Sequence, residues 1–324
     1  MDFPPRRPIK VRRRRSGAPG EARPDEAPVT KIDLPRSESG RGRTSAGITQ
    51  SEAEQPPRRR ISEGLSRALW SIPLILLAIV VVVAGGAVFT LALIVLAVIG
   101  LRELYRMADQ ARPLVYAGFI SAIALIITAH FGASFQVLLV LVASFPLIFA
   151  FALARAERPN VTYSMSVTLV GVIWIGVPLA HAVLLRDLPL HGAALMADVL
   201  LATFLADTSA YFGGRLFGRT QLAPSISPGK TVEGLIAGFI GGTATFWIAG
   251  LYQDWLSGTD ALILGAAVAL VAPVGDLFES LVKRDFSVKD TGRVFGPHGG
   301  ALDRMDAALF TIVIGYYLSV ALVF

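Results

Sequence analysis

The protein is a chain of 324 residues, of which 53% are hydrophobic and 17% are charged, with a formal net charge of +6. Soluble domains contain about 25% charged residues, so this composition indicates a membrane protein. Cysteine is absent, which excludes disulfide bonds, thiolate catalysis and cysteine-ligated metal sites.

The N-terminal segment differs in composition from the rest of the chain. Residues 1–60 contain 15 Lys and Arg against 8 Asp and Glu, so the positive charge lies there. The segment is rich in Pro, Gly, Ser and Arg and poor in aromatic residues, and such segments cannot bury enough apolar surface to offset the entropy of ordering. We therefore predict a disordered, basic cytoplasmic tail over residues 1–65 and a polytopic membrane domain over residues 66–324.

The membrane domain consists of hydrophobic runs, and a bilayer crossing takes roughly 20 apolar residues. Residues 69–101 are too long for one span, and Gly85-Gly86 is the expected turn between two short helices. The pattern predicts an all-α, polytopic integral membrane protein with about nine transmembrane helices. The later spans are expected near residues 114–130, 133–154, 163–185, 193–213, 232–252, 261–282 and 303–324.

Lys and Arg indicate the orientation of these spans, because they concentrate in cytoplasmic loops. With nine spans, the basic loops near Arg102–Arg112, Arg155–Arg158, Arg215–Lys230 and Lys283–Arg293 all fall on the same side as the tail. We expect a multi-pass protein of the cell inner (cytoplasmic) membrane, with its N-terminus in the cytoplasm and Phe324 on the opposite side.

Three glycines, Gly234, Gly238 and Gly242, recur every fourth residue in the span at 232–252. Such a ladder of small residues lets another helix approach closely. The partner is either a helix of the same chain or a second copy in a homodimer, and the pattern does not choose between them.

Acidic residues inside the predicted spans are the first candidates for function, because a charge within a bilayer is costly. Asp207 lies in "LADTSAYFGG". Asp303 and Asp306 lie one turn apart at the start of the last span, in "HGGALDRMD". Asp207 could instead pair with a base or cap a helix, and the last two acids could simply interact with a helix dipole.

A second acidic group lies in "GDLFESLVKRD", where Asp276, Glu279, Ser280 and Lys283 share one helical face. Carboxylates deep on that face, with a hydroxyl and an ammonium group nearer water, suit a hard cation beside an anionic ligand. An ordinary i,i+4 ion pair is the alternative for Glu279 and Lys283, but it leaves Asp276 unexplained.

Two loops combine basic residues with glycine or hydroxyl groups, which suits phosphate binding. One lies between Lys283 and Arg304, and the other is "GGRLFGRTQLAPSISPGKTVEG". The "SPGKT" segment is not a P-loop, because the first glycine is missing and no strand is predicted before it. Of the four histidines, only His298 lies beside these acids, where it could donate a proton or contact phosphate.

The segment from Ser280 to Asp306, "SLVKRDFSVKDTGRVFGPHGGALDRMD", resembles the signature of phosphatidate cytidylyltransferases, the CDP-diacylglycerol synthases. "GDLFES" and "SPGKTVEG" also resemble blocks of that family, and the resemblance covers roughly residues 65–324. The chain departs from the family pattern at Gly229, where a lysine is usual, at Val232, at Gly296-Pro297 and at Ala307.

The resemblance implies transfer of CMP from CTP to phosphatidic acid, with Mg²⁺ as cofactor and room for a second metal ion. Its partners would be CTP, phosphatidic acid and the bilayer, and no nucleic acid is expected. By resemblance, Asp276, Asp303 and Asp306 would bind the metal, and Asp276, Lys283, Asp303 and Arg304 would be catalytic. The substrate contacts would come from Ser227, Lys230, Thr231, Ser280, Arg284, Lys289, Asp290, His298, Gly299 and Gly300.

Two other functions stay open at this point. A related cytidylyltransferase could act on another lipid phosphate, because the polar signature reads phosphate groups rather than lipid tails. An ion-coupled transporter would also place acids within a helical bundle. The transporter is disfavoured because the charges cluster near one membrane face and no inverted repeat is evident.

Overall fold

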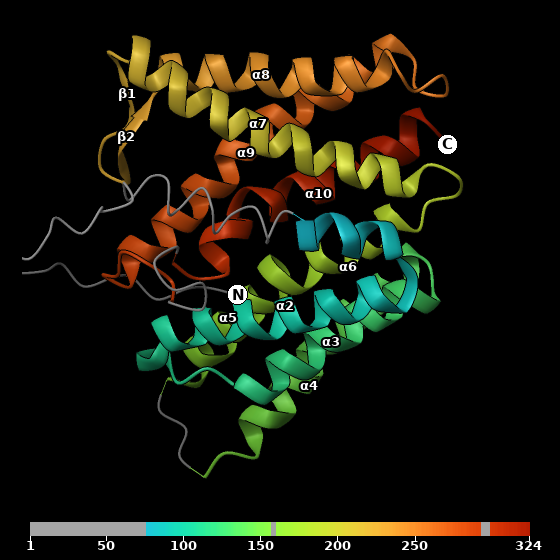
Figure 1. The fold of residues 1–324 in the computed structure, drawn as a ribbon. Coiled ribbons are helices and arrows are strands. Elements are labelled where there is room, and N and C mark those ends of the chain that lie inside the picture. Colours follow the sequence, from blue (N-terminus) through green and yellow to red (C-terminus); the bar gives the residue numbers. More distant parts are fainter. Residues whose placement is uncertain (1–75, 157–159, 293–298) are drawn as a thin grey trace, which may run out of the picture. The chain divides into compact units, whose positions relative to one another are not determined.

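The computed structural model describes residues 76–156, 160–292 and 299–324, and most of these residues are helical (Figure 1). The predicted all-α class is therefore confirmed, whereas the predicted tail over residues 1–65 lies outside the described residues. The longer elements are α2 (Gly86–Met107), α3 (Val115–Phe131), α4 (Ser134–Leu153), α5 (Val161–Gly171), α6 (Val177–Arg186), α7 (Gly192–Phe217), α8 (Val232–Gly250), α9 (Gly258–Asp285) and α10 (Leu302–Leu322).

Within the described ranges, 7 helical rods are long and apolar enough to cross a membrane, so the protein is a multi-pass membrane protein. One of these rods, Val161–Arg186, joins α5 to α6 through the π-helical turn Val172–Gly176. The predicted number of nine spans is approximate, because α3 has only 17 residues and only residues 76–84 of the first predicted span are described.

The predicted break at Gly85-Gly86 is present between the helix at residues 76–84 and α2. Gly85 has a φ of 60°, in the left-handed region that glycine adopts without a Cβ clash. The carbonyl groups at the end of the preceding helix are satisfied by Arg186, whose Nε donates to Val82 O (3.2 Å) and whose Nη2 donates to Val83 O (3.3 Å). Arg186 thereby connects this first helix to the end of α6.

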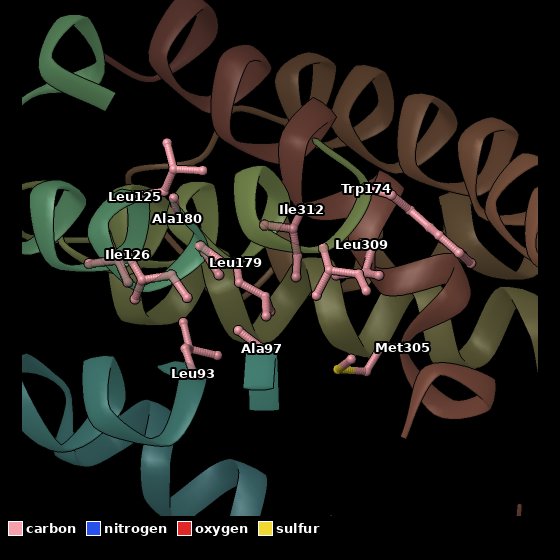
Figure 2. Close-up of a cluster of buried hydrophobic side chains, with 14 of the residues drawn as sticks. Leu93, Ala97, Leu125, Ile126, Trp174, Leu179, Ala180, Met305, Leu309 and Ile312 are labelled. Atoms are coloured by element: carbon pink, nitrogen blue, oxygen red, sulfur yellow. The ribbon is translucent and has the colours of Figure 1, made fainter. Parts of the chain in front are cut away.

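The apolar core lies where α2, α3, the α5–α6 rod and α10 meet, as the labelled side chains of Figure 2 illustrate. Leu125, Ala180 and Leu309 are fully buried in this cluster. Since lipid tails are as apolar as leucine, the stabilisation comes mainly from close packing. The core therefore joins α10, which begins with the candidate acids, to the N-terminal helices. Figure 2 labels Leu93, Ala97, Leu125, Ile126, Trp174, Leu179, Ala180, Met305, Leu309 and Ile312.

The glycine ladder of α8 packs within the same chain. A Cβ at Gly234 would lie 2.8 Å from Ala210 O of α7, and a Cβ at Gly238 would lie 2.9 Å from Ala206 O. Glycine at these positions is what lets α7 and α8 pack backbone to backbone. The ladder therefore has a partner inside the protein, and the alternative of a homodimer stays open without this support.

The loop between α7 and α8 folds into a small antiparallel hairpin of β1 (Gln221–Ala223) and β2 (Ser227–Thr231), a detail that the sequence analysis did not predict. Its base is held by Glu233 of α8, which accepts hydrogen bonds from the backbone N–H groups of Arg219 and Thr220. Thr231 caps α8 through its hydroxyl, which accepts from Gly234 N (3.1 Å). The hairpin thus fixes Lys230 directly before α8.

Candidate active site

A cavity of about 490 Å³ lies among α7, α8, α9, α10 and the β2 strand. Ala206, Gly238 and Ala269 contribute to its small and apolar walls. A concave apolar site with a few convergent polar groups is the usual form of a small-molecule site. The charged groups that line it are Asp207, Arg215, Lys230, Asp276, Asp303 and Asp306.

Three carboxylates gather where α9 crosses α10. One oxygen from each of Asp276, Glu279 and Asp306 lies within 4.8 Å of the others. The close crossing depends on Gly275, because a Cβ at that position would lie 2.9 Å from Ala307 Cα. Asp276 and Asp306 each directly adjoin this contact, so the helix crossing itself brings the acids together.

The carboxylate cluster fits a hard divalent cation such as Mg²⁺. Glu279 is only 1% exposed, and its Oε1 has no hydrogen-bond partner within the described residues. A buried oxygen of this kind is costly unless it finds a partner. Because carboxylate oxygens are the ligands that Mg²⁺ prefers, a cation held by Asp276, Glu279 and Asp306 would satisfy that oxygen and offset the like charges.

Lys283 lies beside this cluster and joins α9 to α10. Its Nζ contacts Glu279 Oε2 at 2.8 Å and Asp303 Oδ1 at 2.9 Å. The ion pair that was the alternative for Glu279 and Lys283 is therefore present, but it forms part of a larger charged group. Lys283 is held between two carboxylates, so its position is fixed before any ligand binds.

A second lysine approaches from the hairpin. Lys230 Nζ lies 2.5 Å from Asp276 Oδ2, so β2 is tied to α9. Asp207 of α7 faces the same cavity. The carboxylates of the site therefore outnumber the lysines that pair with them, and the group as a whole attracts cations.

Asp303 organises the loop that precedes α10. Besides its ion pair with Lys283, its Oδ2 accepts hydrogen bonds from Thr291 N (3.1 Å), Thr291 Oγ1 (3.0 Å) and Gly300 N (2.8 Å). Gly299 directly precedes this contact. A carboxylate with so many donors is held in one orientation, with Oδ1 turned to Lys283.

The structure brings the predicted site residues together to different degrees. Asp276, Asp303, Asp306, Lys230 and Thr231 all line the cavity. Ser280 lies on α9 with its hydroxyl 3.5 Å from Asp276 Oδ1. The other predicted residues that the structure describes do not line the cavity: Ser227 is half-buried at the start of β2, Lys283 pairs with Glu279 and Asp303, Arg284 is exposed and donates to Ile226 O, Lys289, Asp290 and Arg304 are exposed, and Gly299 and Gly300 precede α10. His298 lies outside the described residues.

Two residues near the site were missed by the sequence analysis. Gly275 was read as part of a motif without its packing role. Glu103 is 3% exposed near the end of α2, and its Oε2 accepts from Thr291 Oγ1 (3.2 Å) and Leu302 N (3.0 Å). The predicted span ended at residue 101, whereas α2 continues to Met107. An acid inside a helix that spans the bilayer would have been the signal.

Comparison with known proteins gives a consistent result. Residues 65–322 match the model of the cytidylyltransferase family. The chain is 31% identical over 256 residues to a phosphatidate cytidylyltransferase of Staphylococcus epidermidis, a match that covers 76% of this chain and 95% of the relative. A phosphatidate cytidylyltransferase of Synechocystis is 30% identical over 76% of this chain and 94% of its own length. A third, from Thermotoga maritima, is 42% identical over 39% of this chain and 48% of its own length.

Proposed function

The chain belongs to the cytidylyltransferase family, and from that premise we propose that it transfers CMP from CTP to phosphatidic acid. The products are CDP-diacylglycerol, a precursor in phospholipid biosynthesis, and pyrophosphate. The observation that carries the proposal is the carboxylate cluster of Asp276, Glu279 and Asp306, which is flanked by Lys230 and Lys283 and reaches the cavity through Asp276 and Asp306. The enzyme is thus a membrane-bound nucleotidyltransferase.

The reaction joins two anions. An oxygen of the lipid phosphate attacks the α-phosphorus of CTP, a new P–O bond forms, and the bond to the β-phosphate oxygen breaks with pyrophosphate as the leaving group. The lipid phosphate is already ionised, so little base catalysis is required. The protein must mainly hold both substrates in line and stabilise negative charge.

The two lysines are placed for this work. Lys230 lines the cavity, and Lys283 is held against Asp303, which lines it, so both ammonium groups are positioned before substrate arrives. When bound at the carboxylate cluster, Mg²⁺ would supply Lewis-acid stabilisation of phosphate oxygens, and a second ion could assist. The proposed ligands are Asp276, Asp306 and Glu279. Glu279 here takes the role of third ligand that the resemblance implied for Asp303.

The remaining predicted contacts complete this proposal. The hydroxyl groups of Ser227, Thr231 and Ser280 would contact phosphate oxygens, and the exposed basic groups near the cavity mouth would attract CTP. Asp303 orients Lys283, and it could also reach a second ion. Further contacts with the phosphates of CTP or of the lipid are expected from Arg284, Lys289, Asp290, His298, Gly299, Gly300 and Arg304.

We place the cavity at the cytoplasmic face of the inner membrane. Its charged groups lie near the C-terminal ends of α7 and α9 and the N-terminal ends of α8 and α10, next to the basic loops that favour the cytoplasm. CTP would arrive from the cytoplasm, while the acyl chains of phosphatidic acid stay in the bilayer. The same reasoning leaves the N-terminus in the cytoplasm and Phe324 on the opposite side.

The test is pyrophosphate release by detergent-purified protein given CTP and Mg²⁺, with and without phosphatidic acid, while lipid conversion is followed in parallel. We expect release that requires both lipid and metal, with an equal amount of CDP-lipid. Other lipid phosphates, including an isoprenoid ether lipid phosphate, serve as competing substrates. Preferential conversion of one of these, or pyrophosphate release without lipid conversion, would contradict the proposal.

A further inference from the structure

Glu103 of α2 is a buried carboxylate that does not line the active-site cavity, yet it contacts Thr291 and Leu302, which adjoin Asp303 of that cavity. Burial of a carboxylate costs on the order of several kcal/mol unless donors compensate for the lost water. Two donors reach its Oε2, the hydroxyl of Thr291 and the backbone N–H of Leu302, whereas its Oε1 has no hydrogen-bond partner within the described residues. Both donors belong to the segment Ser280–Asp306, which is far from α2 in the sequence.

The bond to Leu302 gives α10 a cap from another helix. The residue before α10 is Ala301, whose side chain has no oxygen to accept a hydrogen bond, so the first N–H groups of the helix need acceptors from elsewhere. Glu103 accepts from Leu302 N, the first residue of α10. Its negative charge also lies at the positive end of the helix dipole, where it is stabilised.

The bond to Thr291 connects Glu103 to the catalytic region. Thr291 Oγ1 lies 3.2 Å from Glu103 Oε2 and 3.0 Å from Asp303 Oδ2, so the two carboxylates share its single hydroxyl hydrogen. Asp303 in turn contacts Lys283 through its other oxygen. A continuous chain of contacts therefore runs from Glu103 through Thr291 and Asp303 to Lys283.

Two glycines of the loop make room for the Glu103 carboxylate. A Cβ added at Gly292 or at Gly300 would lie 2.8 Å from Glu103 Cδ, closer than real side chains pack. Gly292 and Gly300 therefore both pack directly against this carboxylate. Sequence reasoning assigned such glycines to phosphate binding, whereas these two also fit the side chain of α2.

We propose that Glu103 is a positioning residue, which caps α10 and holds Thr291 so that Asp303 keeps Lys283 at the reacting phosphates. This inference rests on the proposed cytidylyl transfer, but it concerns a residue outside the cavity. Since Glu103 does not line the cavity, its loss should impair alignment during the chemical step more than the binding of CTP.

The test compares Glu103→Ala, Glu103→Gln, Thr291→Val and Thr291→Ser in full-length protein. We expect Glu103→Ala and Thr291→Val to lower kcat about 10- to 100-fold, as is typical for groups that orient a site, with little change in KM for CTP. Glu103→Gln keeps an acceptor for Leu302 N and should retain more activity than the alanine variant. Thr291→Ser keeps the hydroxyl and should restore most of it.

A double variant, Glu103→Ala with Thr291→Val, separates a shared chain of contacts from two independent defects. We expect it to be no slower than the worse single variant, because both changes break the same link. Thr90→Val is the matched control, since Thr90 is a buried polar residue of α2 whose hydroxyl bonds only within its own helix, to Gly86 O. This control should keep the kcat of the unaltered protein.

Hydrogen exchange at residues 299–303 gives a readout that is independent of turnover, and it should rise in Glu103→Ala but not in Thr90→Val. The proposal is overturned if kcat is unchanged in the Glu103 variants, if KM for CTP rises while kcat is kept, or if the double variant shows multiplied defects. Should Glu103→Ala fail to fold, Glu103→Gln and Thr291→Val decide the same question. If the unaltered protein makes no CDP-lipid, the proposed function has failed instead, and exchange alone judges the role of Glu103.

Discussion

At the scale of single residues, each lysine of the site is already neutralised by a carboxylate. Lys230 contacts Asp276, and Lys283 contacts Glu279 and Asp303. The phosphates of the substrates must therefore share these lysines with acids. A cation at the carboxylate cluster resolves this competition, because it takes over Asp276 and Glu279 and leaves the ammonium groups more available to phosphate.

The first prediction concerns the proposed metal ligands. Asp276→Asn and Asp306→Asn should each lower kcat by on the order of 100-fold or more, because the neutral amide binds Mg²⁺ weakly and charge stabilisation is lost. Pyrophosphate release by purified, folded protein measures the effect. Asp198→Asn is the matched control, since Asp198 is a buried acid of α7 that bonds to Gln253 instead.

Near-normal turnover in either metal-site variant would remove that acid from the metal site. A comparable loss in Asp198→Asn would instead indicate that any altered buried acid disturbs the fold. The concentration of Mg²⁺ needed for half-maximal rate adds a second measure, and it should rise in the two site variants alone.

The second prediction concerns Gly229, where the resembled family usually carries lysine. Gly229 lines the cavity, and a Cβ there would meet nothing within 4 Å. Gly229→Lys should therefore fold normally and add a cation at the cavity mouth. We expect KM for CTP to fall by about two- to fivefold, in line with one exposed charge pair, and the gain should shrink at high salt. Gly229→Ala is the control, and an equal fall in KM there would exclude the charge as the cause.

At the scale of elements, the crossing of α9 and α10 builds the carboxylate cluster. Gly275 allows the crossing, so the third prediction is that Gly275→Ala separates the two helices. Overpacking at such a contact costs about 1–3 kcal/mol of unfolding free energy, and activity should fall with it because Asp276 and Asp306 move apart. Thermal unfolding and pyrophosphate release measure the two effects.

The matched control is Gly258→Ala in the same helix. A Cβ at Gly258 would meet nothing within 4 Å, and alanine is a better helix former than glycine. We expect this variant to be as stable and active as the unaltered protein. If Gly275→Ala behaved in the same way, the close crossing would not be needed to hold the acids.

The elements also separate what the sequence could predict from what it could not. Most of the later spans, the Gly85-Gly86 break and the shared face of Asp276, Glu279 and Lys283 follow from local periodicity, and the described residues have them. Contacts between distant segments do not follow from periodicity. Two examples are the ion pair of Lys230 with Asp276 and the hydrogen bond of Leu302 to Glu103. Both depend on how the helices cross, which cannot be deduced from the hydropathy pattern of a single sequence.

At the scale of the whole molecule, a cation bound at the carboxylate cluster would couple metal binding to folding, because the three acids come from two helices. The fourth prediction is that Mg²⁺ raises the unfolding temperature of detergent-purified protein and that EDTA lowers it. At a metal concentration 100 times Kd, the gain in unfolding free energy is about 2.7 kcal/mol. Removal of metal should also abolish turnover, and added Mg²⁺ should restore it.

Asp306→Asn tests whether this stabilisation arises at the proposed cluster. The variant should lose most of the Mg²⁺-dependent rise while keeping a similar unfolding temperature in EDTA. An undiminished rise in the variant, or no rise in the unaltered protein, would contradict a structural link between the cation and the two helices.

The contact of Glu103 with Thr291 also has a consequence for the biogenesis of the protein. The two residues are 188 positions apart, so α2 leaves the ribosome long before its partner is made. Chains are synthesised from the N-terminus at about 5–20 residues per second, so the Glu103 carboxylate lacks these hydrogen-bond donors for on the order of ten seconds or longer. The Glu103 carboxylate gains its hydrogen bond from Leu302 only after α10, the last helix, has been synthesised and inserted. The buried acid is therefore compensated in the complete protein but not in a chain that still lacks α10.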